Sequence, residues 1–193
     1  MLSLALAGPV KGQDRREGAW MAFRLGYGRA SFSCDTCTAT QRLDGWTMSL
    51  GGGGTLSPHV RLGGDLRFWA NGLGGGGKPL PLIGVVTLML SYYPRTHGGP
   101  FVLGGAGLSG YDACKGRGDP LEPCSNDTSY SGGWGGGVNV GAGWEIPIWG
   151  RTLRPLLVYH HGVVRKLHGP DGSTVATGWH QNLLTLELTL LGE

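Results

Sequence analysis

The stretch Leu184-Thr-Leu-Glu-Leu-Thr-Leu190 alternates apolar and polar residues without a break. Leucines occupy every even position, while Thr185, Glu187 and Thr189 occupy the odd ones. Successive side chains of a β-strand point to opposite faces, so this segment predicts a strand with one apolar and one polar face. The fold of the chain depends on what each of these two faces contacts.

Seven further segments show the same two-residue period, which is typical of β-strands. The eight predicted strands cover residues 19–32, 44–55, 59–70, 80–93, 100–110, 132–146, 152–164 and 180–191. Glycine supplies 39 of the 193 residues. Because each glycine weakens a helix by about 1 kcal/mol relative to alanine, long helices are disfavoured almost everywhere. The sequence therefore predicts an all-β protein.

The polar faces of the predicted strands carry both glycines and charges of both signs. The charged members are Arg24, Arg61, Asp65, Arg67, Glu145, Arg154 and Glu187. In a soluble sandwich or lipocalin-like barrel these groups would face water around an apolar core. In a transmembrane barrel the apolar face contacts lipid and the polar face fills the lumen. Small residues among large ones suit the narrow interior of an eight-stranded barrel, so we expect the seven charged residues to form a lumen network.

The connections between the predicted strands alternate between long and short. Residues 33–43, 71–79, 111–131 and 165–179 form long gaps, and the gaps between them have six residues or fewer. Transmembrane barrels combine short turns at one end with long extracellular loops at the other. This alternation of long and short connections predicts an eight-stranded antiparallel up-and-down transmembrane barrel. Both chain ends are expected on the side of the short turns.

Repeated glycine-aromatic strands carry a resemblance to a known family. They include Phe23-Arg-Leu-Gly-Tyr-Gly-Arg29, Phe101-Val-Leu-Gly-Gly-Ala-Gly107 and Gly141-Ala-Gly-Trp-Glu145. Over residues 19–191 the chain resembles the small outer-membrane β-barrels, the outer-membrane protein A-like transmembrane barrels. The resemblance implies location in the outer membrane of a Gram-negative-type bacterium, as a monomer in contact with the lipid bilayer and lipopolysaccharide.

The N-terminal segment and the overall charge indicate where the protein is located and which partners are disfavoured. Residues 1–8 are apolar and end in small residues, which indicates either the tail of a clipped secretory signal peptide or a simple apolar tail. We therefore divide the chain into a leader, 1–18, and a barrel domain, 19–193. The net charge of +3 comes from scattered basic residues, which does not favour a nucleic-acid partner. No apolar run approaches the length of a transmembrane helix.

Four cysteines, Cys34, Cys37, Cys114 and Cys124, fall in two of the long connections. An even number of cysteines in an oxidising compartment predicts two disulfides, and three connectivities are open. A zinc site formed by both pairs is the alternative. We expect no metal and no cofactor.

The adjacent histidines His160 and His161 are the one pair of titratable residues that could indicate a catalytic site. A lipid A-modifying barrel would need a serine nucleophile within hydrogen-bond reach of a histidine, and no serine follows this pair in the local sequence. We expect the pair to be exposed at the rim or at the membrane interface. The sequence predicts a non-enzymatic membrane scaffold whose disulfide-stabilised loops contact an extracellular partner; a lipid A-modifying enzyme and a soluble ligand-binding barrel are the alternatives.

Overall fold

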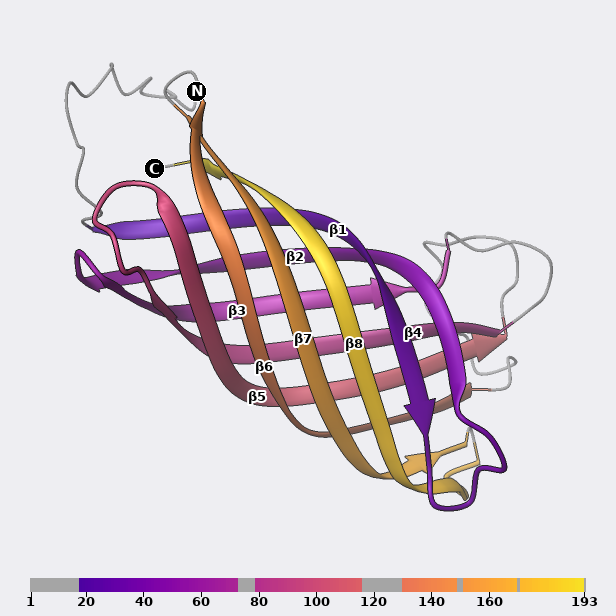
Figure 1. The fold of residues 1–193 in the computed structure, drawn as a ribbon. Helices are drawn as coiled ribbons and strands as arrows, with labels where there is room; N and C mark the ends of the chain where they lie inside the picture. The colour runs from indigo at the N-terminus through magenta and orange to yellow at the C-terminus, as the bar shows by residue number, and fades with distance from the viewer. Residues whose placement is uncertain (1–17, 73–78, 116–129, 149–150, 170, 193) are drawn as a thin grey trace, which may run out of the picture.

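The protein is a closed barrel of eight antiparallel strands that follow one another in chain order (Figure 1). The computed structural model describes residues 18–72, 79–115, 130–148, 151–169 and 171–192. The first strand pairs with both the second and the last, which closes the sheet. The predicted eight-stranded all-β barrel is therefore confirmed. In the described segments, no helix is long and apolar enough to cross a bilayer.

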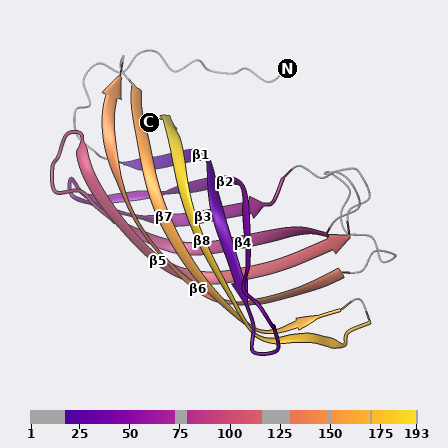
Figure 2. The same cartoon turned by 45° about the vertical axis from the view of Figure 1, so that its right-hand side comes forward.

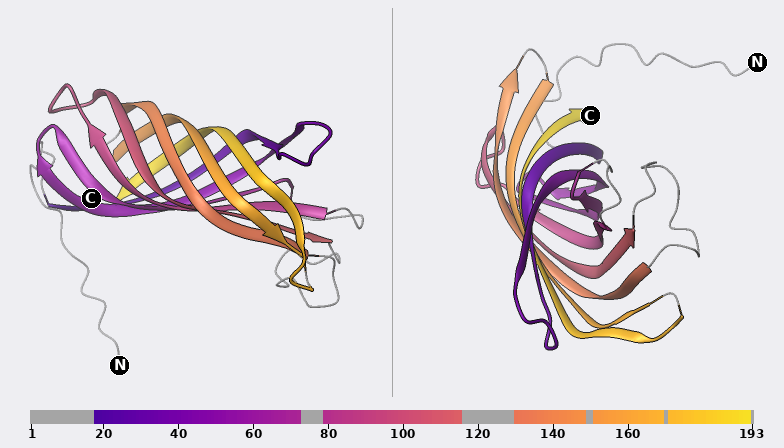
Figure 3. Two further views of the ribbon diagram at one scale, coloured as in Figure 1. Left: turned by 90° about the horizontal axis from the view of Figure 1, so that it is seen from below. Right: turned by 90° about the vertical axis from the view of Figure 1, so that its right-hand side faces the viewer.

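Six of the eight strands are longer than the alternating pattern predicts. They are β1 (Ala19–Ser33), β2 (Gln41–Ser57), β3 (Val60–Ala70), β4 (Pro79–Tyr92), β5 (Gly99–Lys115), β6 (Tyr130–Ile148), β7 (Arg151–His168) and β8 (Thr174–Gly192). We call the end where β1 begins and β8 ends the terminal end, and the opposite end the loop end. Most of the extra length lies at the loop end, where the β1–β2 and β7–β8 hairpins project (Figure 2). The strands run at an angle to the barrel axis (Figure 3), as closure of a sheet requires.

The apolar side chains of the strands face outward. Leu186 and Leu188 are 59% and 54% exposed, whereas Glu187 between them is fully buried. The other strands contribute further exposed apolar residues, and together these form what we call the apolar belt: Phe23, Leu25, Met48, Leu50, Leu66, Phe68, Val86, Leu88, Leu90, Val102, Leu108, Val138, Val140, Leu157, Leu184, Leu186 and Leu188. Contiguous apolar patches larger than a few hundred Å² are rare on soluble monomers, and a continuous belt is typical of a lipid-facing surface. A soluble barrel would bury this face.

Aromatic and then charged side chains succeed the belt toward the loop end. Tyr27 and Trp46 are exposed on neighbouring strands, with ring centroids 5.2 Å apart in an edge-to-face arrangement. Two residues farther along, Arg29 Nε lies 2.8 Å from Asp44 Oδ1. Aromatic rings commonly mark the edge of the hydrocarbon layer, and a solvated ion pair belongs outside it. Where the strands extend beyond the lipid, both of their faces can be polar, and the apolar/polar alternation is lost. The strand ends at the loop end could therefore not be predicted from the sequence.

Candidate functional site

The interior of the barrel holds the charged residues singled out from the sequence. All seven are buried, from fully buried Arg67 and Glu187 to Arg154 at 6% exposed. At mid-height, Arg24 Nη1 lies 2.7 Å from Asp65 Oδ1, and Arg67 Nη2 lies 3.3 Å from Asp65 Oδ2. Charges buried in this way are tolerable when they are paired.

Glu187 extends this ionic chain across the lumen to β8. Arg67 Nε lies 2.9 Å from Glu187 Oε1, to which the Thr185 hydroxyl also donates a hydrogen bond at 3.0 Å. Arg24, Asp65, Arg67 and Glu187 are thus linked in one chain from β1 through β3 to β8. Close to the linked side chains, Gly26 of β1 leaves space that a side chain would occupy, because a Cβ there would come within 2.8 Å of Glu187 Cγ.

A second ionic group lies nearer the terminal end. Arg154 of β7 forms an ion pair with Glu145 of β6, and its Cζ lies 5.7 Å from the centroid of the Tyr93 ring. Arg61 Cζ lies 5.6 Å from the same ring, which stacks on Phe101 with centroids 5.2 Å apart. The structure therefore divides the expected network into two groups, one at mid-height and one around Tyr93.

Above the ionic chain, the lumen toward the loop end is filled by apolar side chains, which we call the aromatic plug. Its rings are Phe32, Trp69, Tyr111 and Trp179, and the Tyr111 and Trp179 centroids are 4.5 Å apart. Aliphatic residues pack around these rings: Ala30, Ile83, Val85, Val164, Leu167 and Leu183. Their close packing fills the loop end of the lumen as an eight-stranded barrel permits.

Between the plug and the ionic chain, a serine and a histidine meet. His160 Nε2 of β7 lies 2.9 Å from Ser109 Oγ of β5, and the Gln181 amide donates to the same oxygen at 2.6 Å. Since that oxygen already accepts from Gln181, the hydroxyl proton is available for Nε2, the arrangement of an activated nucleophile. All three side chains are fully buried, however, and His160 Nδ1 has no hydrogen-bond partner that would orient the ring.

This contact was not visible in the sequence, because its partners are 51 residues apart and on non-adjacent strands. β6 separates them, and it carries a glycine at the crossing point. A Cβ on Gly137 would lie 2.6 Å from His160 Cε1 and 3.0 Å from Ser109 Cβ. The feature of the sequence that could have indicated this contact is Gly137, which lies on the inner face of the strand between the two residues.

The expectation that both histidines lie at the rim or the interface is wrong for His160. Adjacent residues of a strand point to opposite faces, so His160 enters the lumen and His161 faces outward. On the outer face, His161 Nδ1 lies 2.7 Å from Asn182 Oδ1, and the His161 ring stacks against that of His180. The pair is therefore not one catalytic unit.

The first cysteine pair closes the turn between β1 and β2. Cys34 and Cys37 form a disulfide, so neither supplies a thiolate for zinc. The backbone amide of Asp35 in the same turn donates to Thr177 O of β8 at 3.1 Å, which fixes the turn to the neighbouring hairpin. The side chain of Cys114 and the whole of Cys124 lie outside the described residues. Within the described ranges, no three His, Cys, Asp or Glu side chains lie close enough to hold a metal ion.

Comparison with known proteins identifies the fold. No protein-family model matches the chain, and no curated protein sequence matches it. Among solved structures, Neisserial surface protein A is 15% identical over 90% of this chain and 99% of its own, with a TM-score of 0.57. Ail, the attachment invasion locus protein of Yersinia pestis, is 10% identical over 91% of this chain and 99% of its own, with a TM-score of 0.61.

The chain has the fold of the small outer-membrane β-barrels. Both similar proteins are barrels of this kind, so the fold implied by the resemblance of the sequence is confirmed. Ail was also solved in complex with the heparin analogue sucrose octasulfate, and that structure matches with a TM-score of 0.59. At these low sequence identities the similarity shows only that the backbones have the same fold. It says nothing about the side chains in the lumen.

Proposed function

We propose that the protein is a non-enzymatic scaffold of the bacterial outer membrane that presents its loop end to the outside of the cell. The apolar belt supports contact with the bilayer, and the chain ends then lie on the periplasmic side. The charged and polar loop end emerges among lipopolysaccharide headgroups. A monomer suffices for this arrangement, since the sheet closes on itself and leaves no unpaired strand edge.

The observation that carries this proposal is the filled lumen. Three groups of side chains fill the lumen one after another along the barrel axis: the aromatic plug, the Ser109–His160 contact and the ionic chain. A wide passage for solutes is therefore excluded. What remains open to partners is the outer surface beyond the belt. Binding residues concentrate on loops that a rigid scaffold holds, and here a disulfide and the bond from Asp35 to Thr177 hold the β1–β2 turn.

Attachment of cells tests the role of the loop end. Cells that produce the wild type are compared with cells that produce a variant in which residues 168–175 are replaced by Asn-Gly, a two-residue hairpin turn that joins the paired residues Leu167 and Ala176 and keeps Leu167 in the aromatic plug. We expect both proteins to enter the membrane and only the wild type to increase attachment to a heparin-coated surface over an uncoated one. Equal attachment by cells with and without the protein would contradict a surface-contact role.

A lipid A-modifying enzyme is the second candidate, favoured by the 2.9 Å contact of Ser109 with His160. Its difficulty is access, because both side chains are fully buried among lumen residues. Mass profiles of lipid A from cells with and without the protein separate the two functions. The scaffold predicts identical profiles, whereas an altered acyl pattern that disappears in Ser109→Ala would establish the enzyme.

A further inference from the structure

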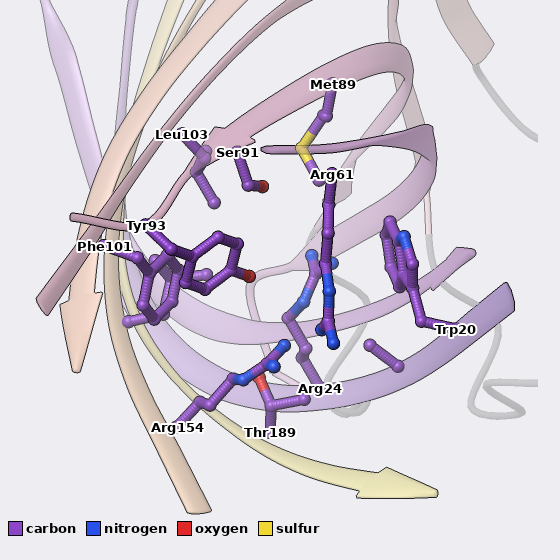
Figure 4. Close-up of a pocket in the computed structure, with 12 residues that line it drawn as sticks. Trp20, Arg24, Arg61, Met89, Ser91, Tyr93, Phe101, Leu103, Arg154 and Thr189 are labelled. Atoms are coloured by element: carbon purple, nitrogen blue, oxygen red, sulfur yellow. The ribbon is translucent and has the colours of Figure 1, made fainter. Parts of the chain in front are cut away.

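In the described part of the chain, the lumen leaves little space for a ligand. The small cavity at the terminal end, among Arg24, Arg61 and Arg154, has a volume of about 20 Å³, which is room for a water molecule (Figure 4). The outer face of the barrel differs, because a polar cluster lies on it just beyond the apolar belt. Two members of this cluster are His161 and His180, and histidine is the commonest metal ligand among the side chains.

The fold brings these two histidines together from neighbouring strands. His161 belongs to β7 and His180 to β8, which lie side by side (Figure 1). His161 is paired with Asn182 and His180 with Val163, so the two histidines are diagonal neighbours on the outer face. Aromatic side chains at diagonal positions of an antiparallel pair are within reach of each other. Here both rings are half-buried, their centroids are 5.9 Å apart and their planes differ by 25°.

His161 is held in a defined orientation by its neighbours. Its Nδ1 lies 2.7 Å from Asn182 Oδ1, which also accepts a hydrogen bond from the Tyr159 hydroxyl at 2.7 Å. An amide oxygen only accepts, so Nδ1 carries the proton, and the lone pair of the neutral ring is on Nε2. Histidines that bind metals commonly donate their other ring N–H to an oxygen in this way, which fixes the tautomer and the direction of the ligating nitrogen. His161 therefore has the arrangement of a metal ligand.

His180 supplies a second nitrogen. A neutral imidazole has a lone pair on one of its two nitrogens, so His180 offers a ligand in either tautomer. Two metal–nitrogen bonds of about 2.0–2.1 Å place the two nitrogens at most about 4.2 Å apart. Ring centroids separated by 5.9 Å allow this distance, because nitrogens that point toward each other lie closer together than the ring centres. Within the described ranges no third His, Cys, Asp or Glu completes the set, so water would occupy the remaining positions.

We propose that His161 and His180 form a surface site for a divalent transition-metal ion, with Nε2 of His161 and one ring nitrogen of His180 as ligands. Imidazole nitrogens suit Cu²⁺, Ni²⁺ and Zn²⁺, and we expect Cu²⁺ to bind most tightly. Mg²⁺ prefers oxygen ligands and should not bind at this site. The ion would connect β7 and β8 where their hairpin leaves the apolar belt. The site goes beyond the proposed surface role and does not depend on it.

Electron paramagnetic resonance of equimolar Cu²⁺ with the detergent-solubilised protein, prepared without a histidine tag, tests the proposal. We expect nitrogen hyperfine structure from two imidazoles on one ion. His180→Gln should leave one imidazole on the ion. His168→Gln, which removes an exposed histidine of β7 outside the pair, is the matched control and should keep both. A wild-type spectrum without two imidazoles, or one that His180→Gln leaves unchanged, would overturn the proposal.

Calorimetric titration with Cu²⁺ measures the contribution of the hydrogen bond that orients His161. Asn182→Ala should weaken the Kd about 10–100-fold, as loss of such a partner of a metal ligand does, while its spectrum keeps both imidazoles. His180→Gln should weaken the Kd further, because it removes a ligand. An unchanged Kd in either variant would contradict the role assigned to that residue.

Thermal unfolding provides a second test of the ion's chemistry. Zn²⁺ should raise the Tm of the wild type and Mg²⁺ at the same concentration should not, since an ion that binds only the folded state stabilises it. The Zn²⁺ effect should be lost in His180→Gln and kept in His168→Gln. Equal Tm values in the two salts would show that the histidine pair does not hold the ion.

Discussion

At the scale of single residues, glycines on the inner face create the space for the polar side chains of the lumen. Gly26 lies beside Glu187, and Gly137 lies beside His160, each at a distance that a Cβ could not keep. Glycine is thus required here for the close approach of neighbouring atoms, which at Gly26 include the backbone oxygen of Leu186, and not for a special backbone angle. The high glycine content of the chain is in part a consequence of packing large polar groups into a narrow barrel.

Gly137→Ala tests this packing argument. The new methyl group would meet His160 Cε1 at 2.6 Å, so the ring must move and its contact with Ser109 must weaken. Overpacking of this kind costs about 1–3 kcal/mol. The neighbouring Gly136 has no atom within 4 Å of an added Cβ, so Gly136→Ala should be nearly neutral. Urea unfolding in detergent micelles measures both, and equal stability of the two variants would refute the account.

Glu187→Ala tests the ionic chain. Removal of this carboxylate leaves Arg67 with Asp65 as its partner, which Arg24 already engages. Breaking a buried pair from one side costs about 3–5 kcal/mol, and we expect the lower end because Asp65 remains. The double variant Arg67→Met/Glu187→Leu removes both charges and should recover much of the loss. A single variant as stable as the wild type in the same urea assay would show that Glu187 is not buried against Arg67.

At the scale of strands, the outer face of a strand contacts lipid within the apolar belt and water beyond it. Within the apolar belt, β8 alternates between lipid-facing leucines and lumen-facing Thr185 and Glu187. Toward the loop end, Asn182, His180 and Val175 follow on the outer face, and the strand continues in a hairpin outside lipid. Substitutions on the same face should therefore have different costs at different heights.

Leu186→Arg places a charge in the middle of the belt. A lipid-facing arginine near the bilayer midplane costs about 2–4 kcal/mol, whereas one near or beyond the interface costs about 0–1. Val175→Arg on the same strand, at the exposed end of the β7–β8 hairpin, is the matched control. Unfolding in lipid vesicles should separate the two variants. Equal costs at both positions would mean that the belt does not lie in a bilayer.

The β7–β8 turn should respond to acid. The Ser173 hydroxyl and backbone amide both donate to Asp171 Oδ1, at 2.6 and 3.0 Å, and these bonds hold the pKa of Asp171 below its ordinary value of 3.8. A carboxyl whose pKa is lowered by folding stabilises the turn above pH 3.8, and this contribution is lost as the pH falls through the lowered pKa.

Hydrogen exchange of the Ser173 amide measures that response. Protection should decrease as the carboxyl is protonated, and in Asp171→Asn it should be independent of pH over the same range apart from the intrinsic exchange rate. Protection in the wild type that does not change below pH 3.8 would show that the carboxylate does not order the turn.

At the scale of the whole molecule, the lumen has three levels that differ in chemistry. The aromatic plug closes the loop end, the hydrogen-bonded and ionic side chains fill the middle, and the small cavity among arginines lies at the terminal end. The apolar belt surrounds the sheet, so the polar groups are shielded from lipid. The barrel is thus a plugged cylinder, and under the proposed function its partners contact the outer surface beyond the belt.

The alternating pattern was sufficient to predict the number of strands, because a two-residue period reports which side chains share an environment. The seven charged residues that the pattern assigned to the polar faces are buried in the structure. It could not predict contacts across the lumen, since these depend on the register of several strands together. Ser109 meets His160 only because β6 presents Gly137 between them. The strand ends were missed for another reason: the outer face of Arg29 and Asp44 is polar, like the lumen face.

The central claim is that the leucines of β8 face lipid and the residues between them face a filled lumen. Spin labels introduced singly at residues 184, 185, 186 and 188, with the protein in lipid vesicles, measure this through collisions with oxygen and with a water-soluble nickel complex. We predict that labels at 184, 186 and 188 collide readily with oxygen and rarely with nickel, and that the label at 185 is shielded from both. Free collision of the labels at 184, 186 and 188 with nickel, or no alternation along the strand, would contradict the account.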